Sequence, residues 1–240
     1  MSAVLQPIVD SLGSIESADG TIQTEPFLAT CRLILPVFDR LGVAFVPAKS
    51  DVSGNIERLA KRAGDHPVLF DIAREEMAAG TQASNSGCCK GMLWLKRFLV
   101  RPLPHPASLV AESAHNAPAA TSPGSTVSSR ALTRPPPRHL PQEFTLNLLA
   151  ELSSEPRQTT MKEAASRAYE RCLKPFHGWI AGGVFSAVLS FPPSREAFVD
   201  SLGGDAAYQS MAQVTRGFGP VLEKIHAFLA ENNLDDPTKV

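Results

Sequence analysis

The 240-residue sequence has almost no net charge and no long hydrophobic run. A formal charge of −1 at pH 7 gives no basic field that would attract nucleic acid or an anionic membrane. No segment approaches the run of about 18 apolar residues that is typical of a transmembrane helix. The N-terminal segment MSAVLQPIVDSLGSIESADG lacks the basic and apolar regions of a signal peptide. We therefore expect a cytoplasmic protein that binds no nucleic acid and has only local, transient contact with a membrane surface.

Cysteine is scarce, and its spacing excludes further classes of protein. Cys88 and Cys89 are adjacent, which fits neither a C-x-x-C metal site nor a disulfide framework. We expect these two residues, with Cys31 and Cys172, to be free thiols of a cytosolic protein. The signatures of serine hydrolases, P-loop proteins, zinc proteases and dinucleotide-binding proteins are also missing, and "GFGPVL" around Gly217 lacks both a third glycine and a preceding strand. The sequence predicts no enzyme, no metal and no cofactor.

Period-two alternation is absent, and most of the chain has the apolar spacing of helices. Residues 25–42 form a helical pattern that we expect to be bent by Pro36 and to end at Gly42. Gly64 and Gly80 are expected to end the next two helices. We predict one all-α domain of about eight helices over residues 25–42, 51–64, 66–80, 90–97 with 143–152, 159–176, 177–191, 194–204 and 205–232.

Residues 98–142 differ from the rest of the chain. They contain nine of its 20 prolines and no apolar period, which is the composition of a disordered segment. Joining Arg97 directly to Glu143 would produce one amphipathic helix whose apolar residues are spaced by 3, 4, 4 and 4, namely Met92, Leu95, Phe144, Leu148 and Leu152. We expect a domain spanning 1–240 with its core in about 27–97 and 143–240. Residues 98–142 are then a disordered surface insertion or, as we favour, a retained intron.

Asp51, Asn55 and Arg58 stand at positions i, i+4 and i+7, so on a helix they share one face. A carboxylate, an amide and a guanidinium side by side suit a polyhydroxylated or an anionic ligand. The alternative is a capped, solvated helix start, because acids and asparagine favour helix N-termini.

The two tryptophans and one histidine are the other candidates. Trp94 follows Lys90 by four residues, so an indole could form a stacking platform for a sugar beside a cation; the alternative is a core tryptophan. His177 opens the nearly all-apolar segment HGWIAGGVFSAVLSF, which we expect to form a buried helix. His177 could face a neighbouring layer or be a satisfied core or cap histidine. Trp179 could be buried or lie at lipid headgroups.

Taken together, these segments resemble the glycolipid transfer protein family. The resemblance covers about Phe27 to the C-terminus, apart from residues 98–142, and rests on these matches in this order: ILPVFDRLG, SDVSGNIERL, GMLWLKR, AYERCLKPFHGWIAGGVFSAVLSFPP and the terminal KV. It implies a two-layer helical sandwich that holds a lipid between its layers. The implied activity is non-enzymatic transfer of glycosphingolipids between membranes.

The resemblance also implies a role for individual residues. Asp51 and Asn55 would bind the first sugar, with Asp51 also accepting from the ceramide amide, and Trp94 would stack under that sugar. His177 would donate to the ceramide carbonyl, and Trp179 would dock on the membrane. Arg58 replaces the family's usual lysine, and Lys90 could support the headgroup. The chain pocket would be lined by Phe38, Phe185 and Leu189. The residue Thr238 replaces an aromatic of the glycolipid branch, which weakens any clamp from that end.

We therefore predict a monomeric carrier that binds a glycosphingolipid. One alternative is a ceramide-1-phosphate carrier, because Arg58 and Lys90 could engage a phosphate. That branch has arginine at the position of Trp94, so the indole favours a sugar. A second alternative is a glycolipid sensor or adaptor that binds without rapid transfer. A lipid hydrolase using His177 and Asp51 would need a nucleophile motif or a metal set, and the sequence has neither.

Overall fold

The computed structural model describes residues 2–99, 144–154 and 158–236. Over these residues the chain forms ten α-helices and no β-strand, so the all-α prediction is confirmed. The helices are α1 (Gln6–Ser11), α2 (Thr24–Arg40), α3 (Val46–Ala63), α4 (Leu69–Ala78), α5 (Cys88–Leu99), α7 (Phe144–Ser153), α8 (Met161–Cys172), α9 (Trp179–Val188), α10 (Arg195–Ser201) and α11 (Ala206–Glu231).

The helix boundaries follow local sequence signals. Gly42 follows α2 with a φ of 93°, a conformation that side chains with a Cβ rarely adopt. At the start of α8 the Thr160 side chain accepts from the Glu163 backbone N–H, and the Glu163 side chain accepts from the Thr160 N–H. The largest error in a predicted start is at α3, which begins at Val46, five residues before Asp51. Helix α4 begins three residues later than predicted, and α8 and α9 each begin two residues later.

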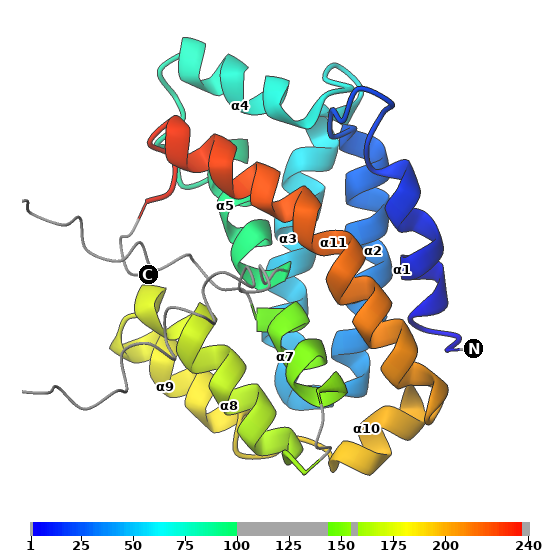
Figure 1. The fold of residues 1–240 in the computed structure, drawn as a ribbon. Coiled ribbons are helices and arrows are strands. Elements are labelled where there is room, and N and C mark those ends of the chain that lie inside the picture. Colours follow the sequence, from blue (N-terminus) through cyan, green and yellow to red (C-terminus); the bar gives the residue numbers. More distant parts are fainter. Residues whose placement is uncertain (1, 100–143, 155–157, 237–240) are drawn as a thin grey trace, which may run out of the picture.

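The middle of the domain is occupied by α5, which contacts α3, α4, α7 and α11. In Figure 1, α11 runs across the front of the molecule with α2 and α3 behind it, and α8 and α9 lie together at the lower left. Because α5 lies between α3 and α11, side chains on its different faces reach both the α3 side and the C-terminal side of the fold. This position makes α5 the element that connects the candidate site to the end of the chain.

The predicted continuous helix that joins Arg97 to Glu143 can be tested only in part, because residues 100–143 lie outside the described residues. Helix α5 continues through Phe98 and Leu99, both buried, so these residues belong to the folded core and not to the proline-rich segment. The rest of residues 98–142 lies outside the described residues, as does Thr238. Helix α7 contacts α5 and buries the predicted apolar stripe, Phe144, Leu148 and Leu152. The structure has ten helices over the described residues instead of about eight, because the helix predicted over 90–97 and 143–152 is counted as α5 and α7, and because α1 was not predicted.

Helix α9 corrects a second expectation. We expected this nearly all-apolar segment to be buried, yet Phe185 is its one buried residue within the helix bounds. Four of the apolar side chains in and after α9 are exposed: Trp179 by 87%, Ile180 by 63%, Val184 by 55% and Phe191 by 80%. No helix in the described part of the chain is long and apolar enough to cross a membrane. The exposed side chains therefore form an apolar feature of the surface.

Candidate functional site

A cavity of about 530 Å³ lies between α3, α5 and α9. Its volume is within the range of small-molecule sites. The hydrogen-bonding and aromatic residues of its lining are Asp51, Asn55, Arg58, Asn85, Lys90, Trp94 and His177. The apolar residues of its lining are Ala44, Pro47, Ala48, Phe98, Ala181, Val184, Phe185 and Val188. The fold thus brings all five predicted headgroup residues to one cavity, together with Lys90 and with Asn85, which the sequence analysis missed.

The α3 wall of the cavity contains Asp51, Asn55 and Arg58 on one face, as their spacing predicted. Asp51 lies in the second turn of α3, so the helix-cap alternative is wrong. The Asn55 side-chain amide donates to the Asp51 backbone oxygen at 2.9 Å, which fixes its orientation. Burial raises the pKa of the Asp51 carboxyl, and the Arg58 charge partly offsets this effect. Asp51 is still exposed, so its carboxylate is available to polar ligand groups.

The α5 wall of the cavity contains Lys90 and Trp94, one turn apart. The Trp94 ring is half-buried; its centroid lies 6.4 Å from that of Phe98 and 5.0 Å from the Arg97 guanidinium carbon. Gly91 lies between Lys90 and Trp94 in the sequence, and a Cβ at this position would approach Arg58 Cδ to 3.1 Å. This glycine lets α3 and α5 pack closely enough for Arg58 and Trp94 to border the same cavity.

His177 precedes α9 and turns toward the cavity rather than into the core. Its ring centroid lies 6.4 Å from Trp94 and 5.7 Å from Phe185. Its Nδ1 lies 3.4 Å from the Tyr169 hydroxyl oxygen, and Tyr169 in turn stacks on Phe185 at 4.5 Å. Burial lowers the pKa of His177, which keeps the imidazole neutral at pH 7. Tyr169 supports the site from outside the cavity lining, through its contacts with His177 and Phe185.

The apolar part of the site is organised around Phe185. Phe144 and Phe45 contact its ring edge-to-face at 5.4 and 6.4 Å. Phe38 and Leu189, predicted with Phe185 to line a chain pocket, are buried in the core and lie outside the cavity lining formed by the described residues. The cavity as it stands therefore has one of the three predicted chain-pocket residues at its wall.

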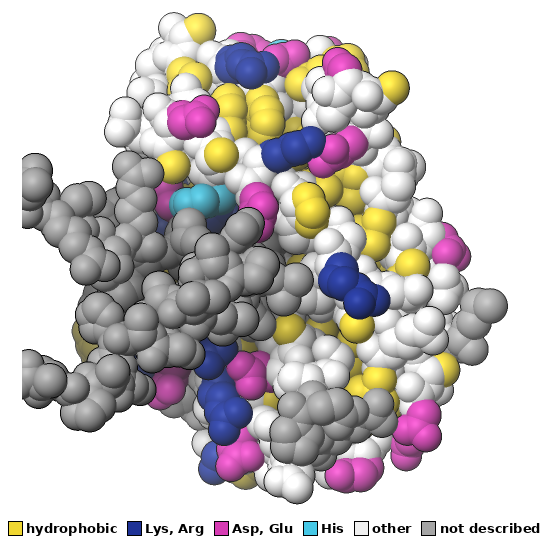
Figure 2. All heavy atoms as spheres, in the orientation of Figure 1, with side chains coloured by type: hydrophobic (Ala, Val, Ile, Leu, Met, Phe, Trp, Pro, Cys, Tyr) yellow, Lys and Arg dark blue, Asp and Glu magenta, His cyan; other side chains and the backbone are white. Residues whose placement is uncertain are grey.

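The mouth of the cavity is bordered by exposed apolar side chains. Val184 is both exposed and part of the lining, and Trp179 and Ile180 precede it on α9. Val43 and Val46, exposed by 89% and 57%, flank Ala44 and Pro47 of the same lining. Over the described part of the face in Figure 2, acidic and basic side chains are interspersed rather than gathered by sign.

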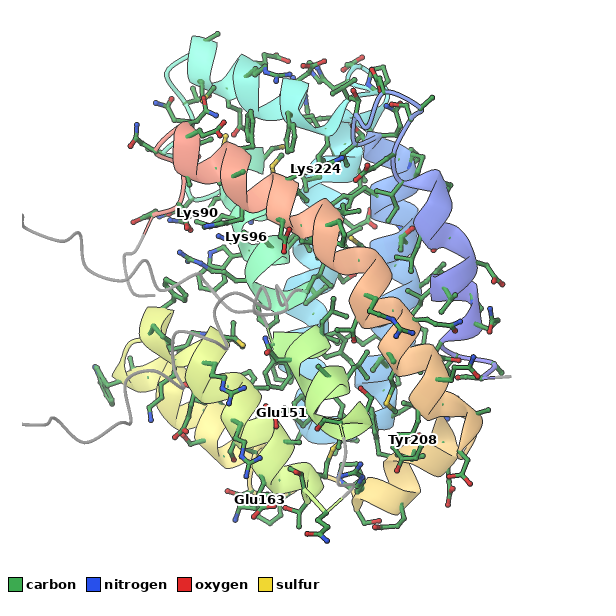
Figure 3. All side chains as sticks on the ribbon, viewed as in Figure 1. Lys90, Lys96, Glu151, Glu163, Tyr208 and Lys224 are labelled. Atoms are coloured by element: carbon green, nitrogen blue, oxygen red, sulfur yellow. The ribbon has the colours of Figure 1, made fainter. Side chains whose placement is uncertain are left out.

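Acidic residues after α11 bind the basic residues of α5, a relationship that no local pattern predicted. Lys90 Nζ lies 2.6 Å from an Asp236 carboxylate oxygen, and Lys96 Nζ lies 3.1 Å from an Asp235 oxygen. Both lysines lie near the C-terminal end of α11 (Figure 3). The fully buried Lys96 and Arg97 are thus compensated from the end of the chain, as buried charges must be.

Within the described parts of the chain, the thiols and carboxylates outside the cavity form no alternative metal site. Among the described residues no group of three His, Cys, Asp or Glu residues could hold a metal ion. The four cysteines are buried. Burial, with the nearby Glu76 carboxylate, raises the pKa of Cys88 to about 11 and that of Cys89 to about 12, so both remain protonated and unreactive at pH 7.

A helical fold around a cavity with hydrogen-bonding groups on one wall and apolar side chains on another defines a protein that binds an amphipathic ligand. The family model described as "Glycolipid transfer protein (GLTP)" matches residues 22–101 and 138–204, more than half of the chain. The chain belongs to the glycolipid transfer protein family. Its activity is therefore lipid binding and transfer, which in this family is non-enzymatic.

Individual relatives agree on this class. Glycolipid transfer protein 1 of Arabidopsis thaliana is 28% identical over 238 residues, which cover 97% of this chain and 96% of that protein. The GLTP-fold structure showing how FAPP2 selects simple glycosphingolipids has a TM-score of 0.70 at 24% identity over 99% of both chains. Human ceramide-1-phosphate transfer protein with 12:0 ceramide-1-phosphate has a TM-score of 0.71 at 14% identity over 98% of both chains. Proteins for both headgroup classes share the fold, so the fold alone does not choose between them.

Proposed function

We propose that this protein transfers glycosphingolipids between membranes, with the sugar in the cavity between α3 and α5. The observation that supports this most directly is the position of Trp94, whose indole borders a cavity opposite Asp51 and Asn55. A hexose has an apolar face that packs on an aromatic ring and hydroxyl groups at its edge that need acceptors and donors. A phosphate would gain little from the indole and would be repelled by the Asp51 carboxylate.

In this proposal the polar groups divide the hydrogen bonds to the ligand among them. The Asp51 carboxylate accepts from a sugar hydroxyl and from the ceramide amide N–H, while Asn55 binds a further hydroxyl. A neutral imidazole has one N–H. If the Tyr169 hydroxyl donates to His177 Nδ1, the proton sits on Nε2, which can then donate to the ceramide carbonyl. No step makes or breaks a covalent bond.

The ceramide chains require more space than the present cavity. Burying a two-chain lipid removes several hundred Å² of apolar surface from water, on the order of 10 kcal/mol before ordering costs. A cavity of about 530 Å³ that already holds a sugar cannot accept both chains. We propose that the cluster of Phe45, Phe144 and Phe185 separates to admit them. Because Phe185 packs edge-to-face against both Phe45 and Phe144, chain methylenes can replace its contacts with them.

The exposed side chains of α9 provide the route to the membrane. Trp179, Ile180 and Val184 form an apolar surface beside the cavity mouth, and tryptophan favours the headgroup region of a bilayer. A contact limited to this face is reversible, which suits a monomeric carrier that must also leave. Buried thiols fit the reducing cytoplasm as the compartment of transfer.

A second candidate function, ceramide-1-phosphate transfer, is favoured by one observation: Arg58 and Lys90 both line the cavity. Transfer from donor to acceptor vesicles, measured with galactosylceramide and with ceramide-1-phosphate, separates the two. We expect preference for galactosylceramide; preference for the phosphate would overturn the proposal. A slow rate with tight binding would indicate a sensor. Native mass spectrometry of the purified protein would identify a co-purified lipid independently.

We also propose that residues 102–137, between α5 and α7, are not part of the lipid-binding domain. The family model leaves residues 102–137 unmatched, within the segment that the composition had separated. Sequencing the transcript tests the retained-intron form of this proposal: a message that lacks these codons supports it, and a single message that contains them leaves a translated insertion.

A further inference from the structure

Lys90 lines the headgroup cavity, but its ammonium group is paired with a carboxylate that does not. Nζ lies 2.6 Å from Oδ2 of Asp236, a residue 146 positions further along the chain. The two side chains are 17% and 39% exposed, so solvent screens this pair only in part. Asp236 lines a neighbouring cavity of about 660 Å³, which Lys90 also borders. Lys90 is therefore part of the wall between two cavities, and its counter-ion approaches from the far side.

This pairing changes the charge that a headgroup meets. The charged residues in the lining of the headgroup cavity are Asp51, Arg58 and Lys90, which sum to one positive charge. The Asp236 carboxylate cancels that charge, so the wall as folded is electrically balanced. An uncharged sugar needs hydrogen bonds but no counter-charge, whereas a phosphate needs uncompensated cations. The balanced charge of the cavity wall therefore favours a sugar headgroup over a phosphate headgroup.

The geometry points to Asp236 as a specificity-determining residue: by pairing with Lys90 it excludes anionic headgroups from the cavity and so selects uncharged sugars. The inference rests on the proposed function and adds to it a residue that does not touch the ligand. Without this carboxylate, Lys90 and Arg58, from α5 and α3, become a two-cation site for a phosphate beside Trp94.

The surrounding contacts make the side chain of Asp236 separable from its backbone. The Asp236 backbone oxygen accepts a hydrogen bond from the Arg97 guanidinium. The neighbouring Asp235 pairs with Lys96 and Arg97 and not with the cavity lysine. Asp236→Asn should thus remove the charge and leave the end of α11 anchored. Asp235→Asn removes an equal charge one residue away and is the charge control; because it also unpairs the buried Lys96, it is compared only as folded protein, below its melting temperature.

The test is vesicle transfer of galactosylceramide and of ceramide-1-phosphate by the full chain. Asp236→Asn is expected to raise the phosphate-to-sugar ratio of transfer rates by about fivefold, the range of partly exposed charge pairs. The separate variant Asp236→Glu keeps the negative charge and should keep the ratio of the unaltered protein. Asp235→Asn should shift the ratio far less, and adding Lys90→Met to Asp236→Asn should remove the gain. An unchanged ratio in folded Asp236→Asn would overturn the inference.

A second comparison does not require Asp236→Asn to fold. In the otherwise unaltered protein, Arg58→Met is expected to reduce the residual ceramide-1-phosphate transfer more than Lys90→Met, because the Lys90 charge is already compensated. An equal or larger loss in Lys90→Met would overturn the inference. If instead the proposed function were wrong, the unaltered protein would not transfer galactosylceramide, which distinguishes that failure from failure of the inference about Asp236.

Discussion

The Tyr169 hydroxyl oxygen lies 3.4 Å from Nδ1 of His177, and thereby connects α8 to the residue that precedes α9. Tyr169 also stacks on Phe185, the buried residue of α9. One tyrosine thus positions both the imidazole beside the headgroup wall and the phenyl ring at the apolar wall. This arrangement makes Tyr169 a positioning residue and leads to the first prediction.

Tyr169→Phe keeps the stacked ring and removes the hydroxyl. We expect transfer of galactosylceramide to fall about fivefold, since one hydrogen bond contributes about 1 kcal/mol, while the melting temperature changes by only a few degrees. The matched control is Tyr208→Phe, because Tyr208 accepts from Arg195 Nε at 3.4 Å, outside the cavity lining. Equal losses in the two variants would show that the hydroxyl has no special role at His177.

Trp94→Ala is expected to reduce glycolipid transfer at least about tenfold, because it removes the stacking surface for the sugar. The far-UV circular dichroism should retain its helical signal, since the indole is only half-buried and alanine favours helix. Trp94→Phe preserves a smaller ring and should retain part of the activity. Full transfer by the alanine variant would mean that Trp94 only packs against its neighbours.

Asp51→Asn should separate binding from stability. Burial raises the Asp51 pKa above 3.8, so the folded state binds a proton more readily than the unfolded state. The free energy of unfolding therefore falls as the pH rises from 3.8, the unfolded pKa, through the higher pKa of the folded state. At pH 7 the charged carboxylate therefore costs stability. We expect Asp51→Asn to melt higher at pH 7, with the difference vanishing below pH 3.8, where the carboxyl is protonated in both states, while glycolipid transfer is lost.

Melting curves of both proteins across this pH range, with transfer assays at pH 7, check the prediction. A lower melting temperature at pH 7 would assign Asp51 a structural role instead. Asp39→Asn is a suitable control, because Asp39 pairs with Lys49 on the surface and lies outside the cavity lining.

Membrane docking through Trp179 can be followed by its own fluorescence, because the chain has only two tryptophans. In Trp94→Phe, the remaining Trp179 is 87% exposed, and its emission should shift to the blue when phosphatidylcholine vesicles are added. Trp179→Ala should weaken vesicle binding several-fold. Retained binding of a short-chain glycolipid by Trp179→Ala would separate docking from headgroup recognition, whereas an unchanged emission in Trp94→Phe would contradict docking at this residue.

Much of the fold could be predicted because its signals are local. Apolar periodicity and the glycines at helix ends, such as Gly42, depend on a few consecutive residues. The exposure of α9 could not be predicted, because its apolar composition is equally consistent with a core helix and a membrane-contact helix. The candidate site was also predictable only in part. Asp51, Asn55 and Arg58 share a face through helix geometry alone. The role of Tyr169 depends instead on its contact with His177, eight residues away and outside its helix.

The sequence by itself determined an all-helical chain, the polar face of α3 and the Lys90–Trp94 pair on α5, because a helix repeats every 3.6 residues regardless of its surroundings. Only the tertiary structure decided that these faces meet at one cavity, that Trp94 borders it, and that Lys90 is neutralised by Asp236. The physical reason is distance along the chain. A pairing between residues 146 positions apart depends on how helices pack, and no local period encodes it.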